Sequence, residues 1–137
     1  MPKYADKVAI IYEGNISKES RTITYAQLHH EVELLAFVMK RRGVGRGDRV
    51  IIYMPMVVEG LIAMLAAARI GAIHSVVFGG FSARELANRI IDSQAKLILS
   101  ASCGLEPHKT IDFHTLIDEA RRLSDTANLP AIFVNRP

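Results

Sequence analysis

The residues best suited to bind a ligand lie in residues 72–85, where an apolar run leads into two glycines and a predicted helix start. The run ending at Phe78 is short and β-branched, which predicts a strand covered on both faces. Gly79 and Gly80 lack a Cβ, so the backbone there can turn sharply and approach another group closely. Ser82 is followed three residues later by a glutamate, which is the spacing of a helix-capping box.

A strand, a glycine turn and a helix N-terminus in this order direct free N–H groups into the space beyond the strand end. That arrangement suits an anion or a nucleotide. The same order also occurs in ordinary tight connections of α/β proteins, so the pattern leaves both interpretations open.

Other groups of residues are weaker candidates for chemistry. The glycine-rich residues 43–48 follow a predicted helix and precede a predicted strand, the reverse of the dinucleotide fingerprint, so they are interpreted as a connection. The five histidines lack the short spacing of metal ligands, and His74 is expected to be a hydrogen-bonded core residue. Cys103 follows a predicted strand but has no evident partner base. The sequence therefore predicts no catalytic group and no metal site.

The elements that must position this stretch begin with an antiparallel hairpin, predicted for residues 8–12 and 21–25. Helices and strands then alternate. Helices are predicted from the Thr24 cap to Gly43, over residues 57–70, from Ser82 onward, and around residues 116–123; strands are predicted at residues 49–54, 72–78, 96–101 and 131–134. The second helix is apolar nearly all round, so it is expected between two layers.

This alternation implies right-handed crossovers and a mostly parallel sheet with helices on both faces, preceded by the β-hairpin. The predicted fold class is α/β, and residues 1–137 are interpreted as a single unit. Half of the 137 residues are hydrophobic, which supports a packed core.

Charge and hydropathy exclude several classes of partner. The net charge is +3 and no dense basic block occurs, which argues against nucleic acid. The longest apolar run, residues 61–68, is far shorter than the roughly 20 residues of a membrane span. The start of the chain has no apolar leader, and the single cysteine suits a reducing compartment, so a cytoplasmic location is expected.

Residues 69–82, Arg-Ile-Gly-Ala-Ile-His-Ser-Val-Val-Phe-Gly-Gly-Phe-Ser, resemble the short-chain acyl-CoA synthetases, the AMP-forming acetyl- and propionyl-CoA synthetases of the adenylate-forming superfamily. Residues 43–50 and 53–56 strengthen the resemblance, which extends from about residue 6 to residue 133. Residues 102–107 look closer to the propionyl-type members.

The resemblance implies a two-step reaction in which a carboxylate and ATP form an acyl-adenylate and coenzyme A then displaces AMP. It implies that the adenine end of coenzyme A rests on Phe78, Gly79 and Gly80. Lys109 matches a family residue that contacts the 3′-phosphate of the coenzyme, with Ile111 as an apolar neighbour. Glu106 stands where acetyl-type members have an arginine, and an ionised carboxylate cannot donate to phosphate.

The family's ATP and magnesium sites and its catalytic lysine belong to later parts of a longer chain. Residues 1–137 therefore resemble a partial N-terminal domain, which is expected to form no acyl-adenylate alone. One alternative is a free-standing coenzyme A- or nucleotide-binding module without catalysis. Another is a structural remnant that self-associates through apolar surface exposed by the truncation. The short carboxylate, ATP and coenzyme A are the expected small-molecule partners.

Overall fold

A computed structural model describes residues 2–14, 18–55, 57–78, 80–101, 103–106 and 109–134. The elements, in chain order, are η1 (Pro2–Tyr4), β1 (Val8–Glu13), β2 (Ser20–Thr24), α1 (Tyr25–Arg41), β3 (Arg49–Met54), α2 (Val58–Arg69), β4 (Ile73–Phe78), α3 (Ala83–Ser93), β5 (Leu97–Ala101), β6 (Cys103–Glu106), β7 (Lys109–Asp112), α4 (Phe113–Leu123) and β8 (Ala131–Val134). In the described part of the chain, none of the helices combines the length and the apolar character needed to span a membrane.

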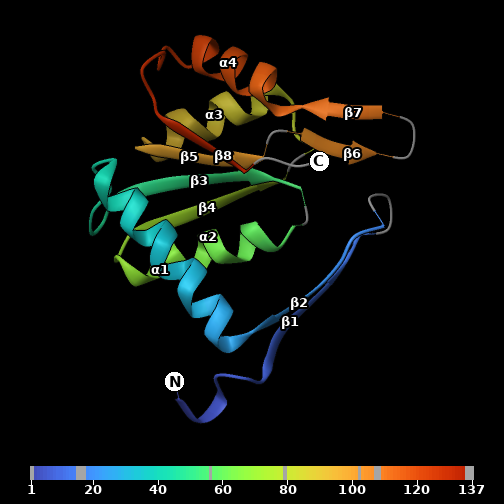
Figure 1. The fold of residues 1–137 in the computed structure, drawn as a ribbon. Coiled ribbons are helices and arrows are strands. Elements are labelled where there is room, and N and C mark those ends of the chain that lie inside the picture. Colours follow the sequence, from blue (N-terminus) through green and yellow to red (C-terminus); the bar gives the residue numbers. More distant parts are fainter. Residues whose placement is uncertain are drawn as a thin grey trace.

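Four strands form the central sheet in the order β4-β3-β5-β8, and every neighbouring pair is parallel. Helices α1 and α2 pack together against one face of this sheet, and α3 and α4 pack together against the other (Figure 1). The predicted α/β fold, with a parallel sheet between two helical layers, is confirmed.

Two antiparallel hairpins accompany the sheet. The predicted N-terminal hairpin is confirmed as β1–β2, which projects away from the central sheet (Figure 1). The second hairpin, β6–β7, follows β5 and was not predicted. Its two strands are only four residues each, and residues 107–108 between them are not an Asn-Gly or Gly-containing pair that marks a tight hairpin turn. The sequence pattern therefore carried no clear signal for this hairpin.

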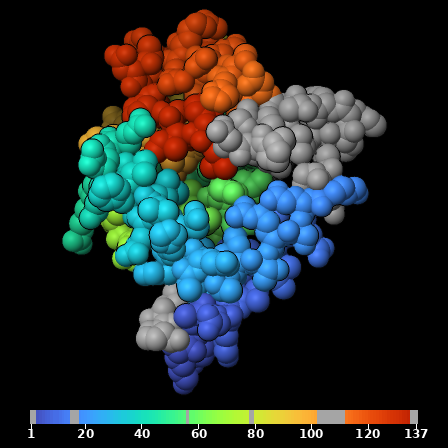
Figure 2. All heavy atoms as spheres, viewed as in Figure 1, coloured from blue at the N-terminus to red at the C-terminus, as the bar shows by residue number. Residues whose placement is uncertain are grey.

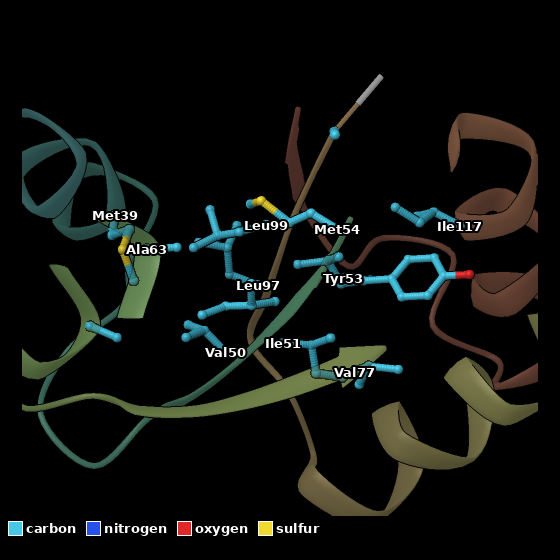
Figure 3. Close-up of a cluster of buried hydrophobic side chains, with 14 of the residues drawn as sticks. Met39, Val50, Ile51, Tyr53, Met54, Ala63, Val77, Leu97, Leu99 and Ile117 are labelled. Atoms are coloured by element: carbon cyan, nitrogen blue, oxygen red, sulfur yellow. The ribbon is translucent and has the colours of Figure 1, made fainter. Parts of the chain in front are cut away.

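The core is built on both faces of the sheet by alternating strand residues. Tyr53 and Val77 point toward the layer that contains Ile117 of α4, whereas Val50 and Leu99 point toward the layer of α1 and α2 (Figure 3). All five side chains are no more than 2% exposed.

The helix boundaries follow the capping residues of the sequence. Thr24 Oγ1 accepts from the Gln27 backbone N–H at 3.2 Å, and the Gln27 side chain accepts from the Thr24 N–H at 2.8 Å, which confirms the capping box of α1. Gly43 follows α1 with φ +89°, the left-handed conformation expected of a helix stop.

The apolar residues Leu116, Ala120 and Leu123 predict an amphipathic helix, and the structure confirms it as α4. Ala120 is completely buried, and the two leucines are partly buried and pack against the core. Phe113 and Ile117 are also buried, so the apolar face begins at the first residue of the helix.

Strand β4 corrects two predictions made for the central stretch. It lies at an end of the sheet, with β3 as its paired neighbour. Ile73 and Val76 are 56% and 57% exposed, so the prediction of a strand covered on both faces is wrong. His74 is also exposed and is not a core residue. A β-branched apolar run indicates a strand but carries no information on its place within the sheet.

Helix α2 is covered on fewer sides than its composition predicts. It packs against β3, β4 and α1, and Ala63, Ala66 and Ala67 are completely buried there. Leu61 and Leu65 remain 37% and 40% exposed, so the helix is not enclosed all round by the described residues.

Candidate functional site

The carboxyl ends of the parallel strands lie at one edge of the sheet. Met54 is in register with Phe78, and Ala101 is in register with Val134. The turn after β4 and the β6–β7 hairpin after β5 both leave the sheet at this edge. The structure therefore places the two segments that contain the predicted site residues at the same edge of the sheet, at the level of the backbone.

The strand order also places a topological switch point at this edge. From β3, the chain passes through α2 to β4, which lies on one side of β3. From β5, on the other side of β3, it passes through β6, β7 and α4 to β8, farther from β3. The connections that follow the adjacent strands β3 and β5 therefore leave in opposite directions. Open α/β sheets bind ligands outside the carboxyl ends of such strands. The sequence could not reveal this feature, because it depends on strand order.

The turn after β4 presents the N-terminus of α3. Gly80 is exposed, whereas Gly79 lies outside the described residues. Ser82 is the N-cap, with φ −72° and ψ 165°, and its Oγ accepts from the Glu85 N–H at 3.2 Å, as the spacing predicts. The remaining N–H groups of the first turn have no partners within the helix and suit an anionic group. The Arg89 guanidinium lies 5.7 Å from the Phe81 ring centroid and adds positive charge beside the turn.

Tyr53, near the end of β3, is hydrogen-bonded to the backbone of this turn. Its side chain is fully buried, and its hydroxyl donates to the Phe81 carbonyl oxygen at 2.5 Å. Burial, and next the negative charge of Glu85, raise the pKa of Tyr53 to about 12, so the hydroxyl stays a neutral donor at physiological pH. No sequence motif marked this residue. Its signal was a tyrosine inside a buried apolar strand, where the hydroxyl needs a partner.

The β6–β7 hairpin carries the other predicted residues. Lys109 and Ile111 lie two positions apart on β7. Glu106 is the register partner of Lys109 on β6. The side chains of Phe78, Lys109 and Ile111 lie outside what the structure describes.

Strand β7 continues directly into α4 through Asp112, the N-cap of that helix. Its carboxylate accepts from the Thr115 hydroxyl at 2.8 Å and from the backbone N–H groups of His114 and Thr115 at 3.0 and 3.4 Å. The Thr115 hydroxyl is the main cause that holds the pKa of Asp112 below its ordinary value. These bonds fix where the hairpin meets the helix.

The chain resembles known proteins in both sequence and fold. It is 53% identical over 116 residues to acetyl-coenzyme A synthetase of Shewanella pealeana, covering 85% of this chain and 18% of that protein. It is 44% identical over 132 residues to the bovine (Bos taurus) mitochondrial acyl-CoA synthetase short-chain family member 3, covering 96% of this chain and 19% of that protein.

The fold matches acetoacetyl-CoA synthetase from Streptomyces lividans with a TM-score of 0.85, over 98% of this chain and 22% of that one, at 23% identity. The chain thus spans about a fifth of the length of the curated relatives it matches. A model of the family described as AMP-binding enzyme matches residues 1–132. The chain belongs to this family of AMP-binding enzymes.

Proposed function

We propose that residues 1–137 form a single α/β unit, the N-terminal part of the large domain of an AMP-forming short-chain acyl-CoA ligase. The whole protein would activate acetate or propionate with ATP and then transfer the acyl group to coenzyme A. The observation that carries this proposal is the 53% identity to an acetyl-coenzyme A synthetase over 85% of the chain. We propose a cytoplasmic location, because the single cysteine of residues 1–137 allows no disulfide within this part of the protein and suits a reducing compartment.

In the proposed reaction, a carboxylate oxygen attacks the α-phosphorus of ATP and pyrophosphate leaves. The coenzyme A sulfur then attacks the acyl carbon, and AMP leaves. We assign ATP and magnesium binding to parts of the protein beyond residues 1–137. The role proposed for this chain is to bind and orient coenzyme A at the carboxyl edge of the sheet.

Two segments supply the proposed coenzyme A surface. Phe78, Gly79 and Gly80 would lie under the adenine ring, because glycine permits close approach. Lys109 would meet the 3′-phosphate as a point charge, with Ile111 as its apolar neighbour. The switch point between β3 and β5 supports this location independently of the family resemblance.

Carboxylate-dependent exchange of pyrophosphate into ATP tests the proposed activity in the native protein that contains this chain, with acetate and propionate supplied separately. Exchange with either acid is expected, and the ratio of the two rates reports the preference. The 137-residue chain alone is expected to give no exchange above a blank without carboxylate. Absence of exchange from the native protein would contradict the proposed ligase, and exchange by the isolated chain would contradict the assignment of ATP binding elsewhere.

A mostly apolar groove of about 240 Å³ lies between α1, α2 and the β5–β8 side of the sheet, with Glu31 and Glu59 also among its lining residues. Leu34 and Val38 of α1 face Ile132 and Val134 of β8 across it, and the two elements lie side by side in Figure 2. Leu34 is 49% exposed. We propose that the chain, taken alone, self-associates with a second copy through this groove, because apolar surface of this kind favours association.

Leu34→Glu is expected to shift the isolated chain from dimer toward monomer, because a carboxylate in the groove must be desolvated on association. Sedimentation equilibrium over a range of concentrations measures this shift. Ile91→Glu is the matched control, since Ile91 is 54% exposed on α3, in the other helical layer. Equal association constants for the two variants would contradict a role for the groove.

A further inference from the structure

Strand β3 connects the two segments of the proposed coenzyme A surface. The turn after β4 and the hairpin after β5 leave strands that do not pair with each other, and both of these strands pair with β3. A side chain near the end of β3 can therefore reach toward both segments. Tyr53 is one residue from that end, in register with Val77 of β4 and Ser100 of β5.

Tyr53 contacts the first segment directly, and it contacts the residue that follows the second segment. Its hydroxyl donates to the carbonyl of Phe81, one residue before the α3 N-cap. Its ring meets the ring of Phe113 edge-on, with centroids 5.1 Å apart and an interplanar angle of 69°. Phe113 is the first residue of α4 and directly follows β7, so its position sets the base of the hairpin.

The surroundings of Tyr53 restrict both its backbone and its ring. The Ser100 hydroxyl, itself fully buried, donates to the Tyr53 carbonyl oxygen at 2.6 Å and ties β3 to β5. The close-up in Figure 3 shows the Tyr53 ring directed away from the strand, toward the helical layer that contains Ile117. A phenylalanine would fill the same space but could not donate to the turn.

We propose that Tyr53 is a positioning residue that fixes the turn after β4 relative to the β6–β7 hairpin and so preorganises the surface for coenzyme A. This inference rests on the proposed function. It gives the hydroxyl a role beyond packing, because a preorganised surface loses less conformational freedom when a ligand binds.

Tyr53→Phe in the 137-residue chain tests the proposal by two measurements. The first is amide hydrogen exchange at Glu85 and Leu86, whose N–H groups donate to the Ser82 Oγ and carbonyl oxygen at 3.2 and 3.0 Å. The second is the affinity for coenzyme A by titration calorimetry. We expect the hydrogen-exchange rate at both amides to rise about fivefold. We expect the affinity for coenzyme A to fall about fivefold as well, because each change reflects the loss of one hydrogen bond.

Ser124→Ala is the matched control. It removes a partly buried hydroxyl that donates to the Ala120 carbonyl at 2.8 Å, near the other end of α4. We expect it to change neither measurement, although it removes the same kind of bond.

Two outcomes would overturn the proposal. The first is a hydrogen-exchange rate at Glu85 and Leu86 that stays, in Tyr53→Phe, within about twofold of the wild-type rate. Such a change is smaller than the loss of one hydrogen bond produces. The second is faster exchange with an unchanged coenzyme A affinity. A wild-type chain that does not bind coenzyme A would instead contradict the proposed coenzyme A surface, and the exchange rates would then decide whether Tyr53 fixes the turn.

Discussion

Phe113→Ala is expected to lower the free energy of unfolding by about 3–5 kcal/mol, the usual effect of removing a buried phenyl ring. Phe113 is 1% exposed and packs against the Tyr53 ring at the junction of β7 and α4. Its truncation would leave a cavity between α4 and the sheet that the surrounding side chains can fill only in part. Because the whole domain is expected to be stable by only about 5–15 kcal/mol, this single change would remove a large share of its stability.

Urea unfolding followed by far-UV circular dichroism measures this loss. Phe37→Ala is the control, because Phe37 is 60% exposed and the Arg41 guanidinium lies over its ring at 5.7 Å. The control is expected to change the free energy of unfolding by less than about 1 kcal/mol. Similar losses for the two variants would show that Phe113 is not a core residue in solution.

Lys109→Ala is expected to weaken coenzyme A binding by about tenfold, the effect of losing one charge-assisted contact to a phosphate. Dephospho-coenzyme A lacks the 3′-phosphate, so its affinity should be almost unchanged by the same substitution. Titration calorimetry of the chain with both compounds separates a specific phosphate contact from a general loss of binding. Comparable losses for both compounds would contradict the role proposed for Lys109.

Two further variants sharpen this test. Lys96→Ala removes a lysine that pairs with Asp48 at 3.4 Å, at the opposite, amino edge of the sheet, and should leave coenzyme A affinity unchanged.

Glu106→Arg reverses the charge of the residue in register with Lys109 and should strengthen binding of coenzyme A more than of dephospho-coenzyme A. A weaker preference for the 3′-phosphate in the Glu106→Arg variant would place that phosphate away from the hairpin.

The type and order of most elements could be predicted from the sequence, because they depend on local patterns. Helix caps and stops depend on residues only a few positions apart. The structure confirms the cap at Thr24, the helix stop at Gly43 and the cap at Ser82. The alternation of strands and helices likewise predicts a parallel sheet, since crossovers of this length return the chain in the same direction. The glycine turn after β4 is recognisable as a possible binding segment for the same local reason.

The strand order, the β6–β7 hairpin and the partners of Tyr53 were decided by tertiary structure. An apolar run such as residues 73–78 is compatible with a central or an edge strand. The structure places β4 at the end of the sheet, where Ile73 and Val76 are exposed. The sequence determined which segments could bind a ligand. Tertiary structure determined that the strands before these two segments flank the same strand, β3, because strand order depends on contacts between residues far apart in the chain.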